Sequence, residues 1–119
     1  MLSQMLFHII GADEWEIAKA AGEYQPAGLA SEGFIHLSRK EQILRPANLL
    51  YQGRVDLSLL VIDPSSVHHE VVFEPGSHGE TEDFPHLYGP LNVDAVVDVV
   101  PFPWNGDGGR FVLPEGLPD

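Results

Sequence analysis

The sequence predicts an α+β protein with a small, largely antiparallel sheet and two helices that come early in the chain. The 119 residues have a length typical of one domain, and 44% of them are hydrophobic, enough for a single core. Helical signals occur in the first half of the chain, and short apolar runs dominate the second half. This order is typical of α+β proteins rather than of a doubly wound parallel sheet.

The first elements are a strand and a helix. Residues 5–10 are an apolar run that predicts a buried strand, with His8 inside it. An acidic start followed by apolar residues near helical spacing predicts a helix over about 13–21, with Gly22 as its end. The segment 24–33 is rich in Gly, Ala and Ser and is expected to be a loop.

A second strand and a second helix follow. Residues 33–38 read as a strand, and Ser38 with Glu41 has the spacing of a capping box, which predicts a helix starting at that serine. Pro46 should kink this helix or restart it, because proline removes a backbone donor. Gly53 is expected to end it.

The second half of the chain predicts strands. Residues 57–62 form the most hydrophobic run and should be the central strand. Residues 67–74 and 95–100 predict two further strands, the last of them stopped by Pro101. Residues 84–90 are a compact aromatic segment.

The domain is expected to span 1–103, followed by a Gly/Pro-rich tail over 104–119. Glycine and proline replace periodic apolar residues there, so we expect more mobility than in the sheet, with 111–113 as the part that could pack back. On this view, removing residues 115–119 should barely change the melting temperature.

The composition limits the partners. The formal charge is −12, with six Lys and Arg against 18 Asp and Glu. Such a surface repels phosphate backbones, which excludes non-specific nucleic-acid binding and docking on anionic lipid. Without cysteine there is neither a disulfide framework nor a Cys-based zinc site. The start of the chain has no signal-peptide pattern and no apolar run long enough to span a membrane, so we expect a cytoplasmic monomer.

Three histidines are the first candidate site residues. His8, His36 and His86 each lie within a short apolar or aromatic stretch. A buried imidazole must find hydrogen-bond partners. The three can be separate histidines satisfied within the core, or they can converge on one pocket, and the sequence leaves both readings open.

Three further residues also have two readings each. Ser38 can be a helix cap or, because free backbone N–H groups lie beside it, part of an anion site. Glu74 can be an exposed strand-end carboxylate or an acid/base group at a cleft rim. Tyr88 shares a face with His86 if the chain is extended there, which suits either core packing or a platform for a flat heterocycle.

No metal site is expected. Neighbouring His68 and His69 would point to opposite faces of a strand, and His78 lies near acidic residues without a compact ligand motif. A metal-dependent hydrolase built on these histidines is the weakest of the functional alternatives.

Four segments carry a family resemblance. In order along the chain, residues 7–9, 33–38, 59–63 and 84–90 resemble the bacterial domain-of-unknown-function family numbered 952, over about residues 5–102. Gly-Phe-Ile-His-Leu-Ser and Phe-Pro-His-Leu-Tyr-Gly-Pro are a specific pair of motifs. The family's fold is thought to be similar to the ADP-ribosyltransferase fold, a split mixed-sheet domain that holds NAD in a cleft.

A second likeness implies the same fold. RNA phosphotransferases of tRNA splicing carry an Arg-His near the start of the domain and a Val-His-Leu-Ser strand later, similar to His8 and residues 35–38 here. Position 7 is Phe rather than Arg, and few arginines remain to hold phosphates. The fold therefore carries over better than the activity.

The resemblance implies a His-lined cleft for a nucleotide-like ligand, with NAD as the cofactor. His8 would bond the ligand's ribose or amide, His36 and Ser38 would form the opposite wall, and His86 and Tyr88 would close the site. The catalytic candidates are His8, His36 and Glu74, and the reaction would be glycosyl (ADP-ribosyl) transfer. The alternative is a non-catalytic module of the same fold that binds a small molecule or a protein.

Overall fold

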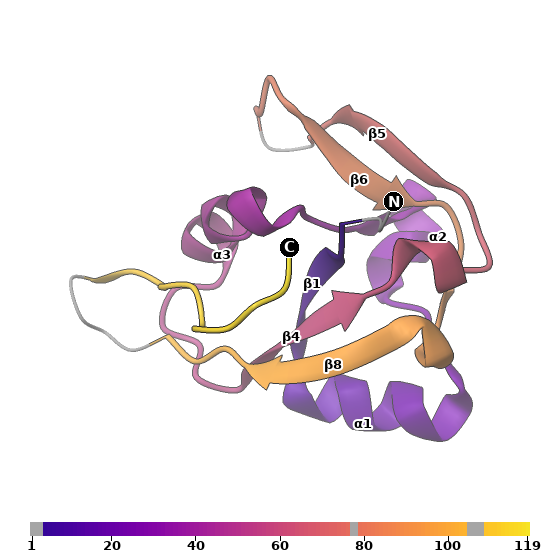
Figure 1. Cartoon of the computed structure of the whole chain (residues 1–119), viewed down its shortest axis with the longest axis horizontal. Helices are drawn as coiled ribbons and strands as arrows, with labels where there is room; N and C mark the ends of the chain where they lie inside the picture. The colour runs from indigo at the N-terminus through magenta and orange to yellow at the C-terminus, as the bar shows by residue number, and fades with distance from the viewer. Residues whose placement is uncertain (1–3, 77–78, 105–108) are drawn as a thin grey trace.

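Two strands predicted from the sequence, β1 (Leu6–Gly11) and β4 (Leu57–Ile62), lie at the centre of the structure. The protein is described by a computed structural model over residues 4–76, 79–104 and 109–119. The two strands pair antiparallel, and β8 (Val96–Pro101) pairs antiparallel with the other edge of β4. The order β1-β4-β8 confirms residues 57–62 as a central strand (Figure 1).

The first helix also follows the prediction. Helix α1 covers Ala12–Ala21, and the Glu14 carboxylate accepts a hydrogen bond from the Gly11 backbone N–H at its start. The helix ends at Gly22, whose φ of 85° is a left-handed conformation that glycine adopts without strain. Trp15 and Ala18 are its buried residues, and they belong to a core cluster with Leu60 of β4.

The expected loop over 24–33 is wrong. Strand β2 (Glu23–Tyr24) pairs with β7 (Leu91–Asn92), and helix α2 covers Ala27–Glu32. Pro26 precedes this helix, and Gly33, with φ of 87°, ends it. None of its residues is fully buried, and Leu29 alone packs partly buried against the first core cluster, so the helix has no apolar periodicity by which the sequence could reveal it. The described residues therefore contain three α-helices rather than two.

The expected helix cap at Ser38 is also wrong. The Ser38 backbone exchanges two hydrogen bonds of 2.8 Å with Phe7, and the residue that precedes the next helical turn is Arg39 rather than Ser38. The Arg39 N–H instead donates to the Gln42 side chain at 3.0 Å, which caps a short 3-10 helix over Lys40–Gln42. Helix α3 (Leu44–Leu50) then restarts with Pro46 in its first turn, where the missing N–H costs nothing.

A second sheet contains the aromatic segment. Strand β6 (Asp83–Leu87) pairs antiparallel with β3 (Ile35–His36) on one side and with β5 (Val71–Pro75) on the other. β5 is shorter than the strand expected over 67–74. Each pairing among the described strands is antiparallel, which confirms an α+β protein with a divided antiparallel sheet.

The β1-β4-β8 and β3-β6-β5 sheets touch where Phe7 of β1 pairs with Ser38 just after β3. In Figure 1 the β5–β6 hairpin lies above the β1-β4-β8 sheet and α1 lies below it. Beyond the Phe7–Ser38 bridge, the described residues show no further backbone pairing between β1 and β3: His8 pairs with Leu60 of β4, and His36 pairs with His86 of β6. The split places residues of both sheets around one opening.

The residues after β8 complete a core rather than lie outside it. Residues 110–119 contain no helix or strand, in line with their Gly and Pro content. Phe111 and Leu117 are nonetheless 1% and 7% exposed and pack with Phe7 and Phe102 in a second core cluster. The Met5 N–H also donates to the Asp119 carbonyl at 2.9 Å. This segment is therefore not peripheral, although residues 105–108 lie outside the described part.

Leu117→Ala should lower the free energy of unfolding by roughly 2 kcal/mol, because it leaves a cavity in the second core. The melting temperature should fall by about 8 °C, and deleting residues 115–119 should cost at least as much. Val112→Ala is the control, since Val112 is 56% exposed. An unchanged melting temperature for the truncated chain would restore the view of a dispensable tail.

Candidate functional site

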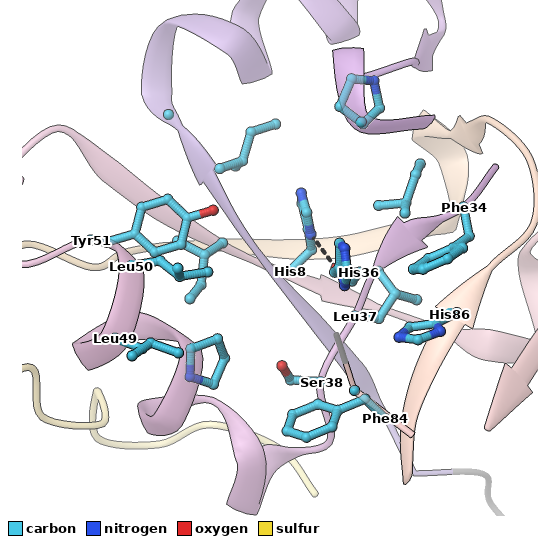
Figure 2. Close-up of a pocket in the computed structure, with 18 of the residues that line it drawn as sticks. His8, Phe34, His36, Leu37, Ser38, Leu49, Leu50, Tyr51, Phe84 and His86 are labelled. Carbon is cyan, nitrogen blue, oxygen red and sulfur yellow. Dashed lines mark hydrogen bonds between the residues drawn. The ribbon is translucent and has the colours of Figure 1, made fainter. Parts of the chain in front are cut away.

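A cavity of about 320 Å³ opens where the two sheets separate. Figure 2 shows β1 and β3 crossing its centre, with Phe34 and His86 on one side and Leu49, Leu50 and Tyr51 of the α3 region on the other. Most of its wall is apolar, interrupted by a few polar groups. This combination is typical of small-molecule sites.

Strand alternation explains the aromatic wall. Residues 34, 36 and 38 share one face of the extended segment. His36 lies opposite His86 on β6. Phe84, two residues before His86, therefore faces the same side. Phe34 stacks on His86 with ring centroids 4.0 Å apart and an interplanar angle of 16°. The rings of His36 and His86 are 5.3 Å apart, edge to face. Two short antiparallel strands thus build one wall of the cavity.

His86 carries the most distinctive chemistry of this wall. The residue is 2% exposed, and its Nδ1 lies 2.7 Å from a Glu74 carboxylate oxygen. The Tyr88 hydroxyl donates to the same oxygen. These bonds, from Tyr88 first and then His86, lower the pKa of Glu74 and keep it ionised. Because a carboxylate only accepts, Nδ1 carries a proton, and in the neutral form of the ring the lone pair is then on Nε2.

The His86 Nε2 atom has no partner. In the part of the chain that the structure describes, it is one of three buried side-chain nitrogens without a hydrogen bond, with Arg39 Nε and Trp104 Nε1, and of these three residues His86 lines the cavity. An unsatisfied buried polar atom costs about 1–3 kcal/mol. A ligand that donates a hydrogen bond would remove this cost.

His8 has a different environment. Its Nδ1 donates to the His36 carbonyl at 2.6 Å, and its Nε2 faces the Tyr24 hydroxyl at 3.4 Å. Burial lowers the pKa of His8 to about 4, against a smaller opposing effect of the bond to His36. The ring is therefore neutral at pH 7, and both of its nitrogens are occupied. It forms part of the cavity wall and joins β1 to β3.

The remaining predicted site residues divide into two groups. Ser38, 8% exposed, and His36, whose Nε2 lies 3.0 Å from a Glu32 carboxylate oxygen, line the cavity with the other two histidines. Glu74 and Tyr88 are not among the lining residues and lie behind His86. The structure thus brings the three histidines together on one concave surface and places the carboxylate one residue away from it.

Sequence reasoning missed several lining residues. Phe34 could have been found, because it lies two residues before His36 and so shares its face of an extended chain. Tyr24 and Tyr51 could not, since each comes from a separate element that only packing brings to the cavity.

Among residues 4–76, 79–104 and 109–119, no three His, Asp or Glu side chains are grouped so that they could hold a metal ion, and His78 lies outside these ranges. Across the same residues, the helices are all too short or too polar to cross a bilayer.

The neutral His8 should make stability depend on pH. The His8 imidazole binds a proton near pH 6.5 in the unfolded chain and only near pH 4 in the folded protein. Its contribution to the free energy of unfolding is therefore fully present above pH 6.5 and is lost as the pH falls toward 4. The loss attributable to this group should be as much as about 3 kcal/mol. Denaturant unfolding at several pH values checks it. His8→Gln should flatten the slope in this window, whereas His68→Gln, at an exposed position, should not; equal slopes for wild type and His8→Gln would contradict the assignment.

The comparisons with known proteins agree with the family resemblance. A comparison with curated proteins finds no match. The X-ray structure of protein CC0527 from Caulobacter crescentus, a structural-genomics target, is 32% identical, with a TM-score of 0.80 over 92% of this chain and 95% of that chain. The solution NMR structure of CC0527 is similar with a TM-score of 0.75 at 33% identity, over 89% and 90% of the two chains. The family model described as "Protein of unknown function (DUF952)" matches residues 9–99, and the chain therefore belongs to the DUF952 family.

Proposed function

We propose that this protein binds a nucleotide-like small molecule in the cavity between its two sheets. The flat heterocycle of the ligand lies against the aromatic wall of Phe34, Phe84 and His86, and a ligand hydroxyl or amide N–H donates to His86 Nε2. NAD is the ligand that the resemblance to ADP-ribosyltransferase-like domains implies, with its nicotinamide riboside half in the cavity.

The unpartnered His86 nitrogen is the observation that carries this proposal. Glu74 holds the other nitrogen of the ring, so the orientation and the tautomer of the imidazole are set before a ligand arrives. An acceptor prepared in this way selects ligands with O–H or N–H groups, which sugars and carboxamides supply. Ser38, on the same wall, can donate or accept a second hydrogen bond.

The size and the wall of the cavity support the same class. A volume of about 320 Å³ is at the lower end of the roughly 300–1,000 Å³ of ligand pockets. It suits one heterocycle with a sugar rather than a whole dinucleotide. The divided antiparallel sheet, with the cavity at the division, supports the expected ADP-ribosyltransferase-like arrangement.

A second function, glycosyl transfer, is favoured by the Glu74–His86 pair. A carboxylate-backed imidazole is a suitable general base. In such a reaction the bond between the ribose C1′ and the nicotinamide nitrogen breaks, and nicotinamide leaves with the bonding electrons. An acceptor oxygen forms the new bond to C1′ while its proton passes to His86 Nε2. Glu74 would then stabilise the imidazolium as a positioning residue, rather than contact the ribose.

His86→Phe should weaken ligand binding at least tenfold, because it keeps a ring against Phe34 and removes the acceptor; one hydrogen bond of about 1.4 kcal/mol corresponds to this factor. Titration calorimetry with nicotinamide riboside, NAD, ADP-ribose and nicotinamide measures it. Tyr88→Phe is the control, since it removes the other neighbour of Glu74 and leaves the cavity unchanged. Binding by His86→Phe as tight as by wild type would show that Nε2 does not meet the ligand.

Glu74→Gln separates an enzyme from a binding module. It should lower NAD turnover at least tenfold, because the imidazolium loses its counter-ion, and leave ligand affinity within about threefold, because Glu74 does not line the cavity. Nicotinamide release, followed by chromatography with water and with added acceptors, is the readout. Wild-type protein that binds the ligand but releases no nicotinamide would exclude the transfer reaction and leave the binding function.

A further inference from the structure

Five of the six basic residues of the protein are already paired with carboxylates. The sequence contains six Lys and Arg, and all six lie in the described ranges. Five of them have a carboxylate partner within 3.3 Å, in the pairs Lys19–Glu16, Arg39–Glu41, Lys40–Asp119, Arg45–Glu80 and Arg54–Asp56. The sixth, Arg110, is exposed and does not line the cavity.

Arg54 is the basic residue in the cavity lining. Its Nε and Nη2 atoms donate to the two oxygens of Asp56 at 3.0 and 2.7 Å. This is the bidentate geometry in which a guanidinium would otherwise hold a phosphate. The same bonds raise the pKa of Arg54, so the group stays charged and stays occupied.

Two carboxylates also line the cavity. Glu14 accepts a hydrogen bond from the Gly11 N–H, and Glu80, with its side chain 7% exposed, lies 3.3 Å from Arg45 Nε. His8, with its pKa near 4, adds no positive charge at neutral pH. The lining therefore holds two carboxylates, of which Glu80 is paired with Arg45, and one guanidinium, Arg54, which is paired with Asp56.

We infer that the ligand of this cavity carries no phosphate and belongs to the nucleoside class, with a ring that is uncharged or positively charged. The inference rests on the proposed function, and it narrows the ligand from nucleotide-like molecules, NAD included, to nucleosides without a phosphate. A buried phosphate needs a cation or several free N–H donors to replace its hydration. In this cavity a phosphate would have to displace Asp56 from Arg54 and would lie close to the carboxylates of Glu14 and Glu80. A pyridinium ring, in contrast, is compatible with the carboxylates and the apolar wall.

The test compares ligand pairs that differ by one phosphate. Calorimetry at low ionic strength measures the dissociation constants of nicotinamide riboside against its 5′-monophosphate, and of adenosine against adenosine 5′-monophosphate. At least one nucleoside should bind, and at least tenfold more tightly than its phosphate. The ratio should fall as salt is added, because salt screens repulsion between charges.

Asp56→Asn tests the cause. Asp56 is exposed, and this change frees Arg54 without altering the cavity wall, so it should reduce the preference for the nucleoside several-fold. Glu41→Gln is the matched control: it changes the net charge by the same amount but frees Arg39, which does not line the cavity. An equal effect of both variants would show that net charge, and not Arg54, sets the preference, and would overturn the local explanation.

The outcomes separate the two proposals. A 5′-monophosphate that binds wild-type protein as tightly as its nucleoside, or more tightly, overturns this inference and leaves the proposed function in place. Absence of binding by all four compounds overturns the proposed function and the inference with it.

Discussion

The junction between β1 and β3 is the constraint on which the rest of the structure depends. The backbones of Phe7 and Ser38 exchange two hydrogen bonds, and directly beside them the imidazole of His8 donates to the His36 carbonyl. A side chain thus occupies the place where a continuous sheet would have a backbone donor. The carbonyl is satisfied although the strands have parted, and the opened sheet leaves room for a cavity that a closed sheet would lack.

This arrangement gives the three histidines different tasks. His8 is neutral and committed at both nitrogens, so it holds the two sheets together. His36 is at the rim, paired with Glu32. His86 is held by Glu74 from outside the cavity and presents an unpartnered nitrogen. Histidine therefore has three roles in this site: His8 links the two sheets, His36 lies at the rim, and His86 offers a hydrogen-bond acceptor. The hydrogen bonds that the fold gives each ring decide which role it has.

Charge affects ligand binding both through the net charge of the whole surface and through the ion pairs at the cavity. The excess of carboxylates over basic residues gives the protein a formal charge of −12, which repels polyanions from the surface as a whole. The structure extends this argument to the cavity, because the basic side chains nearest to it, Arg45 and Arg54, are held by Glu80 and Asp56. Among the residues that line the cavity, Arg54 can therefore bind a phosphate only if Asp56 is displaced.

The sequence alone determined the α+β class, the strands β1 and β4, helix α1 with its end at Gly22, and the family, because these depend on apolar periodicity, on glycine conformation and on local motifs. It also identified the three histidines and Ser38, since polar residues in apolar strands stand out. Only the tertiary structure decided the rest. Helix α2 has a single partly buried apolar residue that packs on the core, Leu29, and so leaves no apolar periodicity. Ser38 pairs with Phe7, a contact 31 positions away along the chain, which overrides its local capping signal. Leu117 and the position of Glu74 behind His86 likewise depend on contacts between distant segments, which periodicity along one segment cannot encode.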